Sequence, residues 1–167
     1  PLLGICLLVS FLLGSLYLYI WTLQPKPMRR PKSLFLLASV ILLTVAVTRS
    51  FFFFLPSVHQ ALPNVPASAL EYSIPVAIGG LLLALLFNSR LAFAGALAIS
   101  ILTSLLAADG FRFFLYSLVS GLTAIFALVG QKDRATMLKA GAAVGLANLY
   151  SILVWSLLSG ATEWFGF

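Results

Sequence analysis

The 167 residues are 62% hydrophobic and 8% charged, with ten Lys or Arg against four Asp or Glu and a net charge of +6. An average soluble domain is about 25% charged, so this composition excludes an ordinary soluble domain. The long, nearly uncharged apolar runs indicate an integral membrane protein. Because Cys6 is the only cysteine, an intrachain disulfide and a Cys-rich metal site are also excluded.

The apolar runs predict an all-α fold, a polytopic helical membrane bundle that forms one domain over residues 1–167. A bilayer core of about 30 Å requires roughly 17–25 helical residues. A lipid-embedded backbone must satisfy its own hydrogen bonds, which favours helices, and the alternation typical of a membrane β-barrel is absent. Six transmembrane helices are predicted, at about Leu2–Leu23, Ser33–Leu55, Ala69–Phe87, Leu91–Ala107, Phe111–Gly130 and Ala135–Ser159.

The connections between these helices are short, with one exception. The first apolar run exceeds the roughly 7–15 residues of a signal peptide, so we expect it to remain as a membrane helix. Residues 56–68 contain three prolines and are expected to form an ordered surface loop. The later turns, at 88–90, 107–110 and 131–134, are so short that consecutive helices are predicted to be antiparallel neighbours.

Positive charge gathers on one side of the predicted bundle. The stretch QPKPMRRPK at 24–32 has four cations and no acid, and short loops rich in Lys and Arg stay in the cytoplasm. Eight of the ten cations lie on this side: Lys26, Arg29, Arg30, Lys32, Arg90, Lys132, Arg134 and Lys139. Both chain ends are therefore expected outside. The first four cations are expected to set the topology, with contact to anionic lipid or docking of a cytoplasmic domain as alternatives.

Small residues at intervals of four mark expected helix contacts, because they let helix backbones approach closely. They are Ala92, Ala96, Ser100 and Ser104 in the fourth predicted helix, Ser117 and Gly121 in the fifth, and Gly141 and Gly145 in the sixth. Leucine in place of Gly145 is expected to overpack such a contact.

Arg49 is the only charge predicted well inside a helix. Arginine against lipid costs at least ~2.5 kcal/mol at a helix centre, so Arg49 is expected either to extend outward along its own side chain or to pair with Glu71. Such a pair would tie the second helix to the third, which contains Pro75. Asn148, near the middle of the sixth helix, is expected to form an interhelical hydrogen bond or to contact a ligand.

Residues suited to catalysis are few. His59 is the only histidine, and the HExxH, Cys/His metal-binding and GxxxxGK[ST] patterns are absent. We therefore expect no enzymatic activity, cofactor or metal site in this chain, and no nucleic-acid partner. The lipid bilayer is the expected partner, and a homo-oligomer or a membrane-complex partner remains open.

Two stretches carry a resemblance to a known family: EYSIPVAIGGLLLALLFNSRLAFAGALAISILTSLL at 71–106 and YSLVSGLTAIFALVGQKDRATMLKAGAAVGLANL at 116–149. Together they resemble the membrane domain of the seven-transmembrane HD-hydrolase family, whose best-known members are bacterial cyclic-di-AMP phosphodiesterases of the PgpH type. The matching features, in order, are Pro75, Leu85-Leu86-Phe87 with Arg90, Ser120-Gly121, and Gly141, Gly145 and Asn148.

The resemblance implies a protein of the bacterial cytoplasmic membrane with an extracytoplasmic sensory domain, seven membrane helices and a cytoplasmic metal-dependent HD phosphodiesterase. A chain that begins with Pro1 is expected to be a processed product or a piece of a longer protein, with a seventh helix and both flanking domains outside it. The alternative is a degenerate relative that kept the bundle and lost the enzyme. The implied function is anchoring and signal coupling for a cyclic-dinucleotide phosphodiesterase. Two alternatives remain: a small transporter or substrate-binding membrane subunit, and an assembly factor for membrane complexes.

Overall fold

The described part of the chain is helical apart from short non-helical stretches at 72–76, 87–88, 105–107 and 109. The computed structural model describes residues 2–23, 31–61, 70–107, 109–128 and 134–165. Its helices are α1 (Leu2–Leu23), α2 (Pro31–Ala61), α4 (Ala77–Leu86), α5 (Ser89–Ser104), α6 (Gly110–Leu128) and α7 (Arg134–Phe165). The all-α prediction is confirmed for these residues. Lys26, Arg29 and Arg30 lie outside them.

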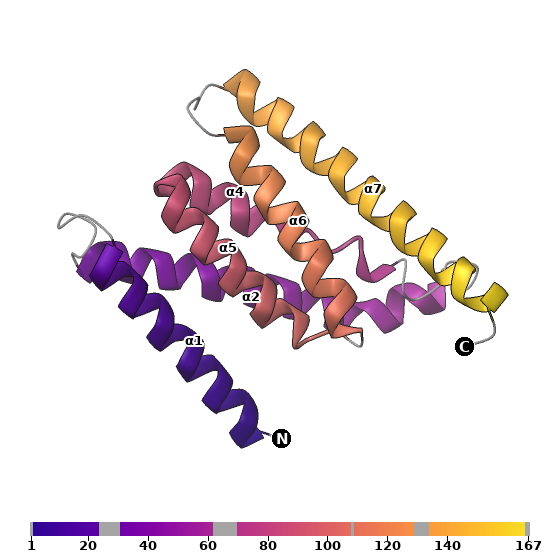
Figure 1. Ribbon diagram of the computed structural model, residues 1–167, viewed down its shortest axis with the longest axis horizontal. Helices are drawn as coiled ribbons and strands as arrows, with labels where there is room; N and C mark the ends of the chain where they lie inside the picture. The colour runs from indigo at the N-terminus through magenta and orange to yellow at the C-terminus, as the bar shows by residue number, and fades with distance from the viewer. Residues whose placement is uncertain (1, 24–30, 62–69, 108, 129–133, 166–167) are drawn as a thin grey trace.

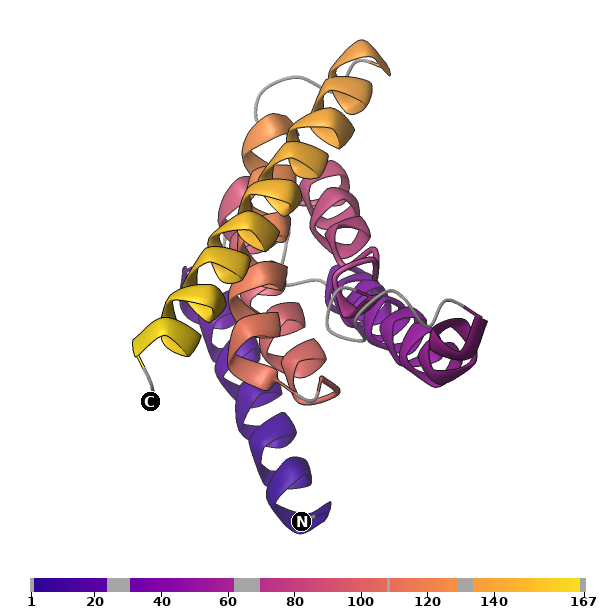
Figure 2. The same ribbon diagram turned by 90° about the vertical axis from the view of Figure 1, so that its right-hand side faces the viewer.

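α5 and α6 occupy the centre of the bundle. They pack on each other, α4 packs on both, and α2 contacts α4 and α5. α7 lies along α6 at one edge of the molecule (Figure 1), and α1 contacts α5 at the other. Figure 2 shows the same order from the side, with α7 and α6 adjacent and α2 extending away from them. Because the turns are short, helices α4 to α7 alternate in direction.

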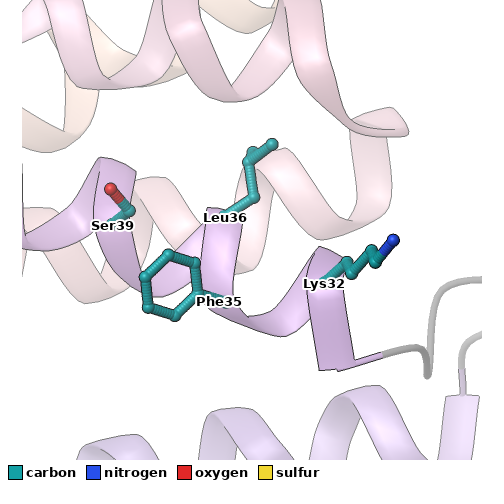
Figure 3. Close-up of a pocket in the computed structure, with 4 residues that line it drawn as sticks. All are labelled: Lys32, Phe35, Leu36 and Ser39. Atoms are coloured by element: carbon teal, nitrogen blue, oxygen red, sulfur yellow. The ribbon is translucent and has the colours of Figure 1, made fainter.

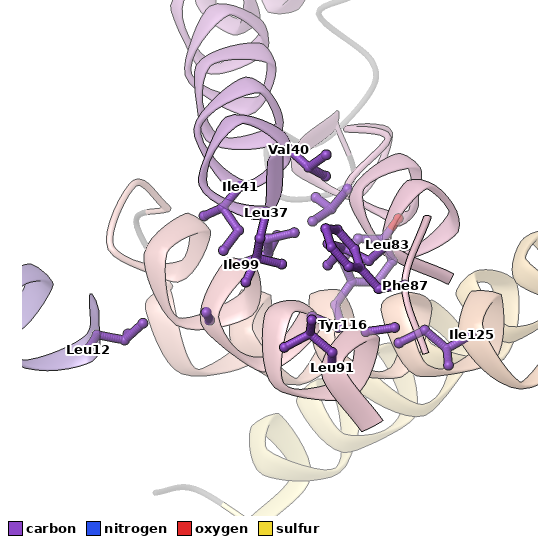
Figure 4. Close-up of a cluster of buried hydrophobic side chains, with 14 of the residues drawn as sticks. Leu12, Leu37, Val40, Ile41, Leu83, Phe87, Leu91, Ile99, Tyr116 and Ile125 are labelled. Atoms are coloured by element: carbon purple, nitrogen blue, oxygen red, sulfur yellow. The ribbon is translucent and has the colours of Figure 1, made fainter. Parts of the chain in front are cut away.

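Two groups of buried apolar side chains hold these helices together. The larger group joins α2, α4, α5 and α6 (Figure 4), and Leu12 adds a contribution from α1. Among its members are Leu37, Val40, Ile41, Leu83, Phe87, Leu91, Ile99, Tyr116 and Ile125. The smaller group, formed by Ala77, Ala124 and Val144, joins α4, α6 and α7. Both groups are built from helix faces whose small and branched side chains interlock, which is how helices associate where lipid surrounds them.

The helix predicted over 69–87 is interrupted in its first half, so this prediction is wrong there. Residues 72–76 form turns, with hydrogen bonds from the Ser73 N–H to the Leu70 carbonyl at 3.1 Å and from the Ile78 N–H to the Pro75 carbonyl at 3.3 Å. Proline has no N–H and disfavours the helical conformation of the residue before it. The regular helix therefore begins only at Ala77, after Pro75.

The second helix is longer than predicted. It begins at Pro31 and continues through Pro56 to Ala61, so the expectation that Pro56 begins a surface loop is wrong. The proline ring removes one backbone hydrogen bond, but membrane helices tolerate this loss when neighbouring groups compensate. The remainder of the predicted loop, residues 62–68, lies outside the described residues.

The structure supports a helical membrane domain but not six complete crossings. Within the described residues, three helices are long and apolar enough to cross a membrane, at Lys32–Ala61, Gly110–Leu128 and Ala135–Leu157. Ala77–Leu86 and Ser89–Ser104 are shorter apolar helices, and Val9–Leu18 is an apolar stretch within α1. The ten residues of α4 extend only about 15 Å, roughly half of a bilayer core.

Large apolar side chains cover the outside of the bundle. Phe53 on α2, Phe126 on α6 and Leu138 on α7 are all exposed. Soluble monomers rarely expose contiguous apolar patches of this kind, and their exposure on several helices matches contact with lipid acyl chains.

Candidate functional site

A cluster of buried hydroxyl groups joins α5 to α6. The Ser117 hydroxyl donates a hydrogen bond to Ser100 Oγ at 3.2 Å, and Thr103 Oγ1 lies 3.4 Å from Ser117 Oγ. Ser100 and Thr103 also donate to the carbonyls of Ala96 and Ile99 in their own helix. The three hydroxyl-bearing residues are at most 1% exposed. We name Ser100, Thr103 and Ser117 the hydroxyl cluster.

Small residues let the helices around this cluster approach closely. Ala92 and Ala96 are buried in α5, and a Cβ atom added at Gly121 of α6 would lie 3.4 Å from the Ala96 Cβ. Gly121 also meets α4, because a Cβ atom at Gly80 of α4 would lie only 2.8 Å from both the Cα and the carbonyl oxygen of Gly121. α4 and α6 therefore touch through their backbones. Of the small-residue positions predicted for α5 and α6, Ala96, Ser100, Ser117 and Gly121 lie at contacts between these two helices, whereas the Ser104 hydroxyl bonds to the Ile101 carbonyl of its own helix.

The contact predicted for Gly141 and Gly145 is wrong within this chain. A Cβ atom added at either glycine would meet no atom within 4 Å, and both residues are exposed. α7 instead packs through the face that contains Ala140 and Val144, both buried. The side chain of Val144 on this face packs with Ala124 of α6 in one apolar cluster. Glycine has no side chain that could make such a contact.

Two buried polar atoms near the middle of α6 and α7 have no hydrogen-bond partner among the described residues. They are Ser120 Oγ and Asn148 Oδ1. Ala124 and Val144 pack in one cluster, and Ser120 and Asn148 each lie one helical turn from these residues, so they occupy the same level of the antiparallel pair. An unpaired buried polar group costs about 1–3 kcal/mol. Polar groups left in this state inside a membrane domain mark candidate functional positions.

A tyrosine pair ties the turn before α4 to the first half of α6. The Tyr116 hydroxyl donates a hydrogen bond of 2.6 Å to the Tyr72 carbonyl, and the two rings meet edge to face with centroids 5.1 Å apart. Phe113 adds a second ring contact to Tyr116 at 5.9 Å. Tyr116 is directly followed by Ser117 of the hydroxyl cluster, so one turn of α6 contacts both the interrupted segment and α5.

Charged residues surround the same end of α6. Arg112 Nε lies 2.9 Å from Asp109 Oδ2, and both side chains are about half exposed. The Arg112 guanidinium also lies over the Trp155 ring of α7, 5.4 Å from its centroid. Burial, and next the nearby Asp109 carboxylate, raise the pKa of Glu71 above its ordinary value. We name Glu71, Asp109 and Arg112 the charged end.

The predicted ion pair between Arg49 and Glu71 is wrong. No ion pair joins these two described residues; the salt bridge at this end of the bundle is formed by Arg112 and Asp109. Arg49 is exposed on α2. The break before Ala77 explains the difference, because Glu71 then lies near Asp109 at the start of α6 instead of opening a continuous helix beside α2.

An apolar cavity of about 340 Å³ lies between α6 and α7. The residues that line it are Leu115, Tyr116, Val119, Tyr150, Ser151, Val154 and Trp155. Its size is at the lower end of the range for small-molecule sites, about 300–1,000 Å³. Neither Ser120 nor Asn148 lines it. Within the described residues, no group of three or more His, Cys, Asp or Glu side chains is placed to hold a metal ion.

The sequence pattern did not single out Tyr72, Tyr116 or Thr103. A signal was available for Thr103, which follows Ser100 by three residues and so shares a helix face with it. The spacing of Asp109 and Arg112 by three residues at the start of a helix similarly predicts an ion pair. No local pattern indicates the bond from Tyr116 to Tyr72, because its partner is a backbone carbonyl 44 residues away.

Comparisons with known proteins agree with this membrane architecture. A family model described as "7TM receptor with intracellular HD hydrolase" matches residues 1–165. Searches among curated proteins and among solved structures found no match.

Proposed function

Because the chain belongs to the family of 7TM receptors with an intracellular HD hydrolase, we propose that its bundle couples a signal from outside the cell to such a hydrolase. The family identifies the chain as a membrane sensory or anchoring domain. We propose that this hydrolase acts on a cyclic dinucleotide. Cyclic-di-AMP is the substrate that the resemblance implies. This chain itself is proposed to contribute no catalytic residue.

The observation that supports coupling is the bond from Tyr116 to the Tyr72 carbonyl. It joins the interrupted segment before α4, which lies beside the charged end, to the helix that contains Ser117 and Ser120. A displacement of Glu71 or Tyr72 would therefore act directly on α6, and through α6 on α5 and α7. Such a coupling requires two arrangements of the helices, and the unpaired atoms of Ser120 and Asn148 supply a reason for a second arrangement in which they are paired.

The proposed orientation places the charged end outside and Lys32 and Arg90 in the cytoplasm, because Lys and Arg concentrate in cytoplasmic loops. Its test uses single cysteines in a background that lacks Cys6. A cysteine at Ser57 should react with an impermeant thiol reagent in intact cells, whereas one at Ser89 should not; both positions are exposed. Reaction at Ser89 and protection at Ser57 would reverse the orientation.

The coupling is tested in the complete protein that contains this bundle and its HD domain, reconstituted in proteoliposomes. Tyr116→Phe removes one hydrogen bond of about 1 kcal/mol and keeps the ring contacts. If that bond biases a two-state equilibrium, hydrolysis of cyclic-di-AMP should change about fivefold. Gly145→Ala is the matched control, because its new methyl group meets no neighbour, and it should leave the rate unchanged.

An unchanged rate in Tyr116→Phe would contradict coupling through this bond and leave the bundle as an anchor. Hydrolysis of cyclic-di-AMP by the purified 167-residue chain would contradict the assignment of catalysis to another domain. The coding sequence downstream of Phe167 gives a further check, since the proposal requires it to encode an HD domain with its His and Asp metal ligands.

The alternative of a small transporter or substrate-binding subunit has one observation in its favour, the cavity between α6 and α7. A transport pathway usually requires ionisable residues inside the membrane, and the residues lining this cavity are uncharged. The signal-coupling function is therefore the better supported of the two. The structure adds no observation in favour of an assembly factor.

A further inference from the structure

A groove with a volume of about 460 Å³ follows the first two turns of α2. Its lining residues, Lys32, Phe35, Leu36 and Ser39, recur at intervals of three and four and so share one face of the helix. Figure 3 shows them on one stretch of α2, with the Lys32 ammonium group extending toward the start of the helix. The volume lies within the range of small-molecule sites.

The apolar part of this groove is open to the surroundings of the bundle. Phe35 is 78% exposed and Leu36 is 40% exposed. Lys32 is exposed as well, and the first turn of α2 contains no acidic residue. The groove therefore combines a long apolar surface with one positive charge at its end, and no carboxylate of that first turn neutralises the charge.

This combination matches an amphiphile with an anionic head group more closely than it matches another helix. Lysine binds a phosphate as a compact point charge, and the apolar side chains continue from it along the helix toward the membrane interior. Lys32 and Ser39 are seven positions apart and therefore about 10 Å apart along the helix axis, which suits the upper part of an acyl chain. A packed helix would instead favour small residues at the contact, whereas this groove has Phe35 at its centre.

The charge of the neighbouring sequence supports the same ligand. Lys26, Arg29 and Arg30 precede α2, and basic residues next to a membrane helix attract anionic lipid with about 1 kcal/mol for each residue near the surface. This attraction raises the local concentration of anionic lipid at the groove.

We propose that the groove at the start of α2 binds an anionic phospholipid, whose phosphate contacts Lys32 and whose acyl chain lies against Phe35 and Leu36. This site is independent of the hydroxyl cluster and of the proposed signal coupling. Its occupancy would link the position of α2 to the lipid composition of the membrane.

The experiment measures binding of labelled phosphatidylglycerol and phosphatidylcholine to the full chain in mixed micelles. Phosphatidylglycerol should bind in a saturable manner and more tightly than phosphatidylcholine. Lys32→Ala should weaken phosphatidylglycerol binding about fivefold, the equivalent of about 1 kcal/mol, and weaken phosphatidylcholine binding less, because the choline ammonium offsets the phosphate charge of that lipid. Phe35→Ser should weaken the binding of both lipids, because it removes apolar contact. Circular dichroism checks that each variant keeps its helices.

The matched control is Lys139→Ala, which removes an exposed cation from the first half of α7 and should leave binding unchanged. A loss as large as that of Lys32→Ala would show that net charge, and not this groove, attracts the lipid. Equal binding of the two lipids by the original chain would also overturn the proposal. A third outcome would overturn it as well: the chain self-associates, and Phe35→Ser abolishes this self-association but not lipid binding. The occupant of the groove would then be a second copy of the chain.

Discussion

Alanine in place of Gly80 should separate α4 from α6 and destabilise the bundle. The new Cβ atom would lie 2.8 Å from the Cα and the carbonyl oxygen of Gly121. Real Cβ atoms essentially never approach another atom to less than 3.0 Å, and nine in ten keep at least 3.4 Å. The obstructing atoms belong to the backbone, so no side-chain rotation relieves the clash and the helices must move apart.

The expected magnitude follows from two opposing effects. Overpacking a close contact costs about 1–3 kcal/mol, while replacing glycine by alanine within a helix gains up to about 1 kcal/mol. Gly145→Ala gains helix stability without overpacking, because a Cβ atom there meets no atom within 4 Å. The difference in unfolding free energy between the two variants should therefore isolate the clash, with Gly80→Ala the less stable by about 1–3 kcal/mol.

Thermal unfolding of both variants in the same detergent, followed by circular dichroism, measures this difference. Gly145→Ala should unfold at or above the temperature of the original chain, and Gly80→Ala should unfold below it. If the two variants unfold together, the backbones of α4 and α6 are not in contact and the central packing described above is incorrect. If Gly145→Ala is instead the less stable, its face forms a contact that this chain alone does not contain.

The remaining predictions concern the charged end and the hydroxyl cluster. Burial, and next the Asp109 carboxylate, raise the pKa of folded Glu71 above its ordinary value of 4.5, so its contribution to stability should be lost as pH rises from about 4.5 through the higher folded pKa. Glu71→Gln should remove this part of the pH dependence of the melting temperature, and an unchanged pH profile would refute this. Ser100→Ala and Ser117→Ala should show a coupling of about 0.6 kcal/mol in a double-mutant cycle, the average for hydrogen bonds between membrane helices. Additive effects of these two changes would show that the 3.2 Å contact contributes no stability.

Two unpaired polar atoms lower the stability of the described helix arrangement, as the proposed coupling between two arrangements would require. Ser120 Oγ and Asn148 Oδ1 are buried without partners, although other hydroxyl groups of the bundle bond across helices or to their own backbone. A bundle with a single arrangement would gain stability by replacing Ser120 with alanine, because an apolar group of similar shape avoids the desolvation cost. The serine hydroxyl at this position therefore agrees with the proposal that Ser120 finds a partner in another arrangement of α6 and α7.

The sequence alone was sufficient to predict a helical membrane domain. Long uncharged runs must bond their own backbone in lipid, and this local requirement does not depend on which helices meet. For the same reason the bounds of α1 agree with the prediction. Helices α5, α6 and α7 each begin within a few residues of their predicted first residue. The short turns similarly predicted the antiparallel order of the later helices, because so few residues allow few other connections.

The tertiary structure decided which faces of those helices make contact, and this determines the site. Gly80, Gly121, Gly141 and Gly145 all occur in apolar helices, yet only the first two lie where backbones touch. A stripe of small residues permits a close approach, but the approach is made where the surrounding side chains interlock on both helices. The place of Glu71 depended likewise on Pro75, because the regular helix begins only after this proline and the Glu71 carboxylate lies near Asp109. Contacts between residues distant in sequence depend on the packing of the whole bundle, which no single helix contains.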